Sequence, residues 1–169
     1  EKHIVEKALI SVGRVPHTKD LNLDAAGVKI DTRGNILHND SQTDTPNIYA
    51  VGDLTADIAL VNVAELEGRH AVEKIINPSR PELVYENIST IMFLNPEVAG
   101  VGFNEKQALQ AQRAFRVACF QYNFVNRALA MRKKNGFFKL LVSDDEEMRI
   151  LGMRVVGAHA SSTIQAVAL

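Results

Sequence analysis

Residues 43–53 read TDTPNIYAVGD, and this stretch decides how the rest of the chain is interpreted. The apolar run 48–51 follows a proline turn and predicts a short buried strand that ends at Gly52 and Asp53. In open α/β sheets, ligands bind at this end of the strands. Gly52 would let a ligand approach the backbone, and the Asp53 carboxylate is an acceptor suited to a polyol or ribose hydroxyl. On its own, such a Gly-Asp pair is more often only a turn or a helix cap.

The composition limits the possible classes of function. The 169 residues are 46% hydrophobic, which is enough for one substantial core or two small ones. A net charge of −1 gives no electrostatic reason to expect nucleic acid or an anionic membrane as a partner. The apolar runs are too short to span a bilayer, and we expect no signal segment.

Cys119 is the single cysteine, which excludes an internal disulfide and an intrachain redox dithiol. A reducing compartment, the cytoplasm, is therefore expected. The alternating run around Cys119 predicts a small buried hydrophobe and not a nucleophile.

The first half of the chain predicts part of an α/β domain. The expected elements are a strand at 8–12, a hairpin at 28–37 with Gly34 in its turn, a loop at 54–58 with Asp57 as a possible N-cap, and a helix from about 59 to 76 that Asn77 and Pro78 end. The chain would thus begin in the middle of a sheet, as if it were part of a longer protein.

The prolines in segment 78–81 indicate a linker, with a domain boundary between residues 78 and 79. Beyond it the pattern predicts an α+β domain, an antiparallel sheet with helices on one face. The expected elements are strands at 88–93 and 115–122, a hairpin of 136–143 with 148–156, a helix at 105–112 with Asn104 as N-cap, and a helix from Ser162 with a capping box to Gln165. The acidic turn 144–147 lacks the alternating ligands of a calcium loop and predicts a solvated tip.

Residues 43–53 resemble the second FAD-binding motif of the pyridine nucleotide-disulfide oxidoreductases, the flavoprotein family of dihydrolipoamide dehydrogenase, glutathione reductase, mercuric reductase and soluble transhydrogenase. Two further stretches fit in the same order. Residues 8–16, ALISVGRVP, are similar to the strand that closes the family's NAD(P)-binding domain, and residues 94–102, LNPEVAGVG, resemble the start of its dimerisation domain. With ILG at 150–152 and VVGAHA at 155–160, the resemblance covers essentially the whole chain.

The resemblance implies a fold and two cofactors, FAD and NAD or NADP. Residues 1–78 would be the end of the NAD(P)-binding domain and the C-terminal part of the FAD-binding domain, and residues 79–169 a dimerisation domain truncated at its C-terminus. The implied partner is a second copy of the chain.

The resemblance also implies cofactor contacts. Asp53 and Gly52 would contact the flavin nucleotide. A helix start directs free amides and a positive dipole end at its ligand, so Ala59, Leu60, Val61 and Asn62 would face the pyrimidine edge of the flavin. Gly13 would approach the bound NAD(P), although it fits equally a sharp exit turn with Pro16.

The family's catalytic groups are absent from these residues. The reaction needs a flavin, a cysteine pair, a dinucleotide site and a His-Glu base, and the sequence contains neither Cys-x4-Cys nor Gly-x-Gly-x-x-Gly. In the family, the His-Pro that marks the base would follow the last residue of this chain. We therefore expect no catalytic residue here, and no activity of the 169 residues alone.

Several alternatives stay open. The chain fits a C-terminal piece of an FAD-dependent NAD(P)H:disulfide oxidoreductase, a non-catalytic dimerisation module with a vestigial flavin-binding remnant, or an unrelated α/β binding domain. Lipoamide, glutathione, mercuric ion, coenzyme A disulfide or a second nicotinamide nucleotide would all be compatible electron acceptors.

The charged side chains suggest no further site. The basic cluster Arg127, Arg132, Lys133 and Lys134 is expected to be a solvated loop, with a nucleotide phosphate or a partner subunit as the alternative contact. The five histidines lack metal-ligand spacing, so no metal is expected, and His159 is interpreted as structural or interfacial.

Overall fold

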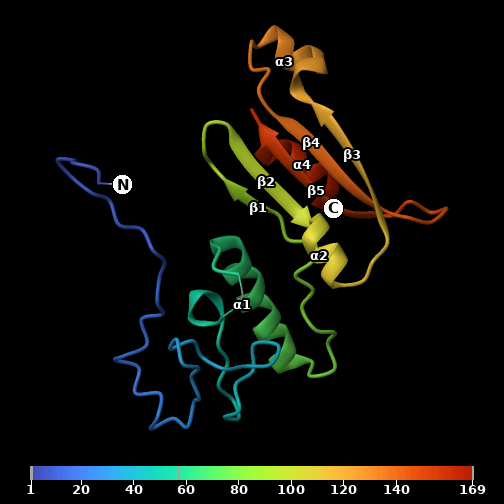
Figure 1. Ribbon diagram of the computed structural model, residues 1–169. Coiled ribbons are helices and arrows are strands. Elements are labelled where there is room, and N and C mark those ends of the chain that lie inside the picture. Colours follow the sequence, from blue (N-terminus) through green and yellow to red (C-terminus); the bar gives the residue numbers. More distant parts are fainter. Residues whose placement is uncertain (1, 57, 169) are drawn as a thin grey trace. The chain divides into compact units, whose positions relative to one another are not determined.

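The computed structural model describes residues 2–56 and 58–168, so the possible N-cap at Asp57 lies outside the described residues. The chain divides into two compact units, Glu1–Leu83 and Val84–Leu169, here the N-terminal and C-terminal units (Figure 1). The sequence places the boundary a few residues earlier, at 78/79.

The C-terminal unit is built on an antiparallel sheet. Its described strands are β1 (Thr90–Met92), β2 (Glu97–Gly102), β3 (Phe115–Gln121), β4 (Phe137–Ser143) and β5 (Ile150–Gly157). They form one five-stranded sheet in the order β1-β2-β5-β4-β3 within the described part of the unit (Figure 1). Every neighbouring pair is antiparallel, as the sequence predicts.

Helices connect and cover this sheet. Helix α2 (Glu105–Gln110) joins β2 to β3, and the 3-10 helix η2 (Tyr122–Phe124) with α3 (Asn126–Ala130) joins β3 to β4. Helix α4 (Ala160–Ala168) packs on β2 and β5. The core between α4 and the sheet contains Ala99, Val101, Tyr122, Ala128, Val155, Ala160 and Ile164. The predicted α+β arrangement is confirmed.

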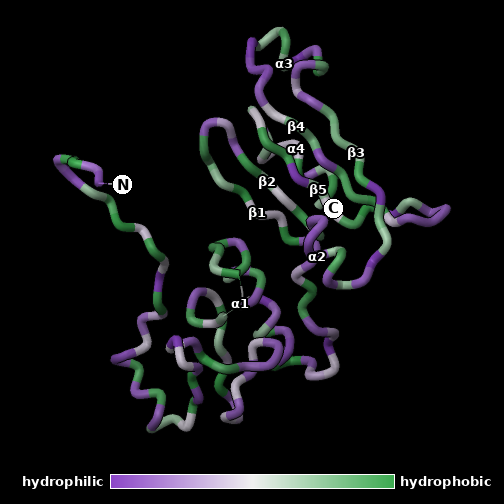
Figure 2. Tube along the Cα trace, in the orientation of Figure 1, coloured by the Kyte–Doolittle hydropathy of each residue, from purple (hydrophilic) through white to green (hydrophobic). Residues whose placement is uncertain are grey.

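The turn between β4 and β5 is the expected hydrophilic tip (Figure 2). Its shape comes from Asp145, whose Oδ1 accepts hydrogen bonds from Ser143 Oγ at 2.7 Å and from the Met148 amide at 2.9 Å. The carboxylate therefore closes the loop on itself, which explains why an acidic run can make a tight turn here.

Two expectations for this unit are wrong. Helix α4 begins at Ala160, so Ser162 lies inside the helix and does not form the expected capping box. Glu97 at the start of β2 takes over that role, because its Oε2 accepts hydrogen bonds from the backbone amide and the hydroxyl of Ser161. Cys119 is exposed, not buried, because β3 is the edge strand of the sheet.

The N-terminal unit contains the 3-10 helix η1 (Gly52–Leu54) and helix α1 (Val61–Ile76), which begins two residues later than expected. A small core of Val28, Ile36 and Ala50 packs with Leu23, Ile48 and Leu54. The expected hairpin is present as a single bridge between Ile30 and Ile36, with Gly34 at φ +87° in its turn.

The two strands expected in this unit do not form. Segment 8–12 is irregular, and the side chains of Leu9 and Val12 are 94% and 92% exposed. Segment 48–51 makes an isolated bridge from Tyr49 to Gln42, and Ile48 and Ala50 form backbone hydrogen bonds with Thr43 and Ser41, but this pairing is too short for a strand. A strand is stabilised by ladder hydrogen bonds to neighbouring strands. Among the described residues no strand lies beside either segment, so the apolar pattern alone does not produce one.

Candidate functional site

The candidate site is the turn at Gly52 and Asp53. Gly52 has φ +74°, which favours glycine, and a Cβ atom there would lie 3.1 Å from the Cβ of Ala64 in α1. Asp53 is the second residue of η1, and its side chain is exposed. The turn thus brings the backbone against a helix and leaves a carboxylate in solvent, where a hydroxyl-bearing ligand could be bound.

Hydrogen bonds hold both sides of the Gly52 residue. Its amide donates to Oε2 of Glu67 in α1 at 2.6 Å, and its carbonyl accepts bonds from Thr55 N at 3.0 Å and Thr55 Oγ1 at 2.9 Å. Glu67 is only 1% exposed. Burying a carboxylate costs free energy unless the group is hydrogen-bonded. The bond from the Gly52 amide offsets that cost for Glu67 and ties the turn to α1.

The start of α1 is the second part of the candidate site. Leu60 is the N-cap residue and provides no side-chain cap. The Leu60 amide already donates to the carbonyl of Ile58 at 2.8 Å, so Leu60 is the weakest of the four proposed backbone donors. Val61 and Asn62 are the first two helical residues, where amides have no partner within the helix.

Gly13 has φ +123° and lies in the exposed, irregular N-terminal segment. Apart from its chain neighbours, no atom lies within 4 Å of where its Cβ would be. The structure therefore brings Gly52 and Asp53 together with α1, through Ala64 and Glu67, and does not add Gly13 to that group.

A buried polar cluster in the same unit was not anticipated from the sequence. Asp40 accepts hydrogen bonds from His70 Nε2 at 2.7 Å, Lys74 Nζ at 2.5 Å and the Leu83 amide at 3.1 Å. Burial would raise the pKa of Asp40, but these donors outweigh it and hold the pKa below its ordinary value. The sequence signal for this cluster is the i, i+4 spacing of His70 and Lys74, which places both side chains on one face of α1.

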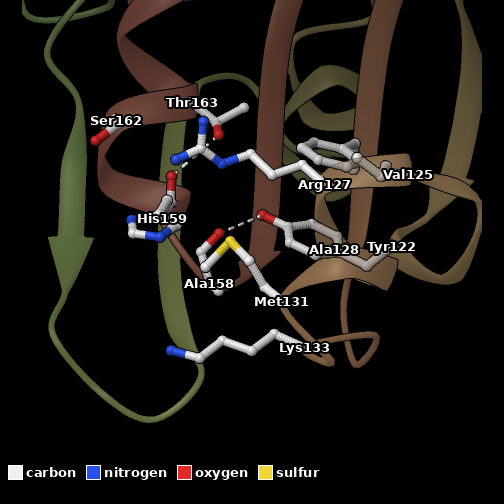
Figure 3. Close-up of a pocket in the computed structure, with 11 residues that line it drawn as sticks. Tyr122, Val125, Arg127, Ala128, Met131, Lys133, Ala158, His159, Ser162 and Thr163 are labelled. Carbon is white, nitrogen blue, oxygen red and sulfur yellow. Dashed lines mark hydrogen bonds between the residues drawn. The ribbon is translucent and has the colours of Figure 1, made fainter.

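The C-terminal unit has a cavity of about 360 Å³ between α3, α4 and the sheet (Figure 3). Tyr122 stacks on Phe138 at 4.5 Å between ring centroids and donates its hydroxyl to the Ala158 carbonyl at 3.0 Å. Arg127 crosses the opening toward Thr163 (Figure 3). The cavity is lined by Tyr122, Val125, Arg127, Ala128, Met131, Lys133, Phe138, Ala158, His159, Ser162 and Thr163.

An adjoining hollow of about 590 Å³ takes in the rest of the basic cluster. Arg132, Lys133 and Lys134 line it together with His159 and Glu97. The cluster expected to be a solvated loop therefore borders two concave surfaces, and both contain His159.

The part of the chain that the structure describes contains no candidate metal site and no candidate membrane-spanning helix. Nowhere in ranges 2–56 and 58–168 do three or more His, Cys, Asp or Glu side chains gather in a way that could hold a metal ion. Among these same residues, no helix has both the length and the apolar character needed to cross a membrane.

Family models match most of the chain. A model of the pyridine nucleotide-disulphide oxidoreductases matches residues 2–68, and a model of the dimerisation domain of these proteins matches residues 88–169.

Individual relatives agree with these matches. A dihydrolipoyl dehydrogenase of Chlamydia muridarum is 37% identical over 163 residues, which are 95% of this chain and 34% of that protein. One of Bacillus subtilis is 36% identical with the same coverage. A mercuric reductase of Lysinibacillus sphaericus is 35% identical over 97% of this chain and 30% of its own length. The chain thus spans about a third of the curated relatives it matches.

Solved structures show the same fold. LpdA from Mycobacterium tuberculosis superposes with a TM-score of 0.86 at 26% identity, over 95% of this chain and 35% of LpdA. The HOCl-induced flavoprotein disulfide reductase RclA from Escherichia coli gives a TM-score of 0.79 at 22% identity, over 94% of this chain and 37% of RclA, a likeness of fold alone.

Proposed function

Because this chain belongs to the pyridine nucleotide-disulphide oxidoreductase family, we propose that it supplies flavin contacts and the homodimer interface of an FAD-dependent, NAD(P)H-linked disulfide oxidoreductase similar to dihydrolipoyl dehydrogenase. The redox cysteines and the His-Glu base would come from residues outside these 169. The 169 residues alone would then not oxidise NADH.

The observation that carries this proposal is the turn at Gly52 and Asp53, held on α1. FAD fits its chemistry, because an exposed carboxylate is a good acceptor for the ribitol hydroxyls of the cofactor. A side chain at position 52 would be strained, because its Cβ would lie 3.1 Å from the Cβ of Ala64 and the φ of +74° is one that L side chains rarely adopt. When bound, FAD would supply the electron transfer between NAD(P)H and the acceptor.

The start of α1 would stabilise negative charge on the flavin. Amides without a helical partner and the positive end of the helix dipole favour an anionic group near the first turn. Val61 and Asn62 lie at that position, and Ala59 and Leu60 precede it. The role of these four residues is therefore to bind and polarise, and none of them would transfer a proton.

The remaining partners follow from the family. The unit Val84–Leu169 would pair with the same unit of a second copy, as the match to a dimerisation domain suggests. Gly13 would contact the NAD or NADP. The acceptor would be a small-molecule disulfide or another oxidant, and the cytoplasm is the proposed location.

The direct test replaces Asp53 by Ala in the complete oxidoreductase that contains these residues. Loss of a hydrogen bond and of the partner for a ligand hydroxyl should weaken flavin binding by about 1–3 kcal/mol, which is roughly 5- to 150-fold in the dissociation constant. Asp44→Ala is the matched control, because Asp44 is an exposed carboxylate of the same segment, paired with Lys29. Equal flavin retention by the Asp53 variant and the parent would show that Asp53 is only a turn residue.

A second candidate is a non-catalytic dimerisation module with a vestigial flavin-binding remnant. The exposed, irregular segment 8–12 fits this module, and it fits the first candidate equally, because the partner strands of a complete dinucleotide domain would come from residues outside these 169. The intact reading frame distinguishes the two candidates. An oxidoreductase requires Gly-x-Gly-x-x-Gly and Cys-x4-Cys before these residues and His-Pro after them, whereas the module requires none of these motifs.

A further inference from the structure

We infer that Glu67 is a positioning residue that holds the Gly52–Asp53 turn on α1 so that Asp53 can bind the flavin. The inference rests on the proposed function, in which Asp53 is the flavin contact. It adds a residue to that function which does not itself touch the cofactor.

The first step is the contact between Glu67 and Gly52. The Gly52 amide donates to Oε2 of Glu67 at 2.6 Å, across 15 residues of sequence. Glu67 is 1% exposed, so little water competes for this bond. A backbone amide bonded to a buried carboxylate is among the stronger hydrogen bonds in proteins.

The second step is the position of Gly52, which directly precedes Asp53. Thr55 binds the Gly52 carbonyl through its amide and its hydroxyl, while Glu67 binds the Gly52 amide. Both peptide groups that flank the glycine are thus held in a left-handed conformation with φ +74°. Because glycine has no Cβ, its backbone could adopt many other conformations if these bonds were lost. Removing the Glu67 carboxylate would therefore release the backbone immediately before Asp53.

The third step concerns the helix that carries Glu67. The same helix presents Val61 and Asn62 in its first turn, where the proposed flavin amides lie. Glu67 therefore connects the two parts of the proposed flavin site, the Asp53 carboxylate and the start of α1. Because α1 is continuous from Val61 to Ile76, the contact of Glu67 with the Gly52 amide and the packing of Ala64 against Gly52 both help to fix the spacing between these parts.

The test compares Glu67→Ala and Glu67→Gln with Val63→Ala in the complete oxidoreductase. Val63 is the matched structural control, because it lies on the same helix and is 0% exposed, and its apolar side chain cannot accept a hydrogen bond from the Gly52 amide. Each variant is measured for thermal stability, for flavin dissociation by fluorescence, and for hydrogen exchange of the peptide that contains residue 52.

Glu67→Ala should raise the exchange rate at residue 52 and weaken flavin binding by about tenfold or more. Glu67→Gln should recover most of both losses, since its amide oxygen can accept the Gly52 hydrogen bond. Val63→Ala should lower stability and leave exchange at residue 52 and flavin affinity near those of the parent.

Other results would overturn the inference. If Glu67→Ala changes flavin affinity no more than Val63→Ala does, Glu67 is only a core residue. Asp53→Ala, measured in parallel, separates this failure from failure of the proposed function. If the Asp53 variant loses flavin and the Glu67 variants keep it, the positioning role of Glu67 is refuted and the proposed flavin contact of Asp53 stands. Flavin kept by the Asp53 variant would refute the Asp53 contact and, with it, the flavin role of Glu67.

Discussion

The carboxylate of Asp40 accepts a 2.7 Å hydrogen bond from Nε2 of His70, although the two residues are 30 positions apart in the sequence. The same carboxylate accepts bonds from Lys74 of α1 and from the amide of Leu83. Asp40 thus joins three segments of the N-terminal unit, namely its own loop, the second half of α1 and the last residues of the unit.

Replacing Asp40 by Asn should destabilise the N-terminal unit by about 2 kcal/mol. The side chain of Asp40 is only 8% exposed, and the substitution removes its charge-assisted hydrogen bonds to Lys74 and His70. Asp44→Asn is the matched control. The side chains of Asp44 and Lys29 are 63% and 67% exposed, and such surface pairs contribute about 0–1 kcal/mol. Denaturant unfolding of both variants measures the difference, and equal losses would contradict a structural role for Asp40.

The Asp40 contacts should also make stability depend on pH in the acid range. The folded-state pKa of Asp40 lies below its ordinary value, so its contribution is complete above the pKa of an unfolded aspartate, about 3.9, and is lost as the pH falls through the lower, folded pKa. The unfolding free energies of the parent and of Asp40→Asn should therefore converge below about pH 4. Other carboxylates with lowered pKa values also titrate in this acid range. The quantity to follow is therefore the difference in unfolding free energy between the parent and Asp40→Asn. A difference that stays constant from pH 7 to pH 3 would contradict the assignment.

Four of the five described strands of the C-terminal unit were predicted from the sequence, because each finds its partner within the chain, whereas β2 and the short helix α3 were not predicted. The hairpin of β4 and β5 combines an apolar pattern, a polar turn and an adjacent partner strand, and all three signals agree. Segments 8–12 and 48–51 show the same apolar pattern without a strand beside them among the described residues, and neither becomes a strand. Hydrophobic pattern alone therefore does not decide strand formation.

The candidate site was only partly predictable. Gly52 and Asp53 could be identified as candidates from the sequence, because a glycine followed by a carboxylate at the end of an apolar run is a local pattern. Glu67 and Asp40 act through partners 15 and 30 residues away, and no local pattern shows which distant groups meet. The prediction that Cys119 is buried is wrong for a related reason, since an alternating pattern does not reveal that β3 lies at the edge of the sheet.

The capping box of α2 should contribute measurably to the stability of the C-terminal unit. The side chain of Asn104 accepts the Gln107 amide at 2.9 Å, and the side chain of Gln107 accepts the Asn104 amide at 3.0 Å. Asn104→Ala should cost about 1 kcal/mol, the usual effect of removing an N-cap. Gln110→Ala, at the exposed last position of α2, is the control and should change stability by less than about 0.5 kcal/mol. Thermal unfolding that ranks the two variants in the opposite order would count against the capping box.

Leu141 and Val117 face each other on neighbouring strands, yet they should differ strongly in what truncation costs. Leu141 of β4 is 0% exposed, whereas Val117 of the edge strand β3 is 46% exposed. Leu141→Ala should destabilise the C-terminal unit by about 2–5 kcal/mol, because it leaves a cavity in a packed interior. Val117→Ala removes apolar side-chain surface that is already about half exposed to solvent, so it should lower the unfolding free energy by less than about 1 kcal/mol. Chemical denaturation of both variants measures the contrast. A large loss for Val117→Ala would mean that β3 is covered in solution, and the proposed pairing with a second copy predicts that such a loss depends on protein concentration.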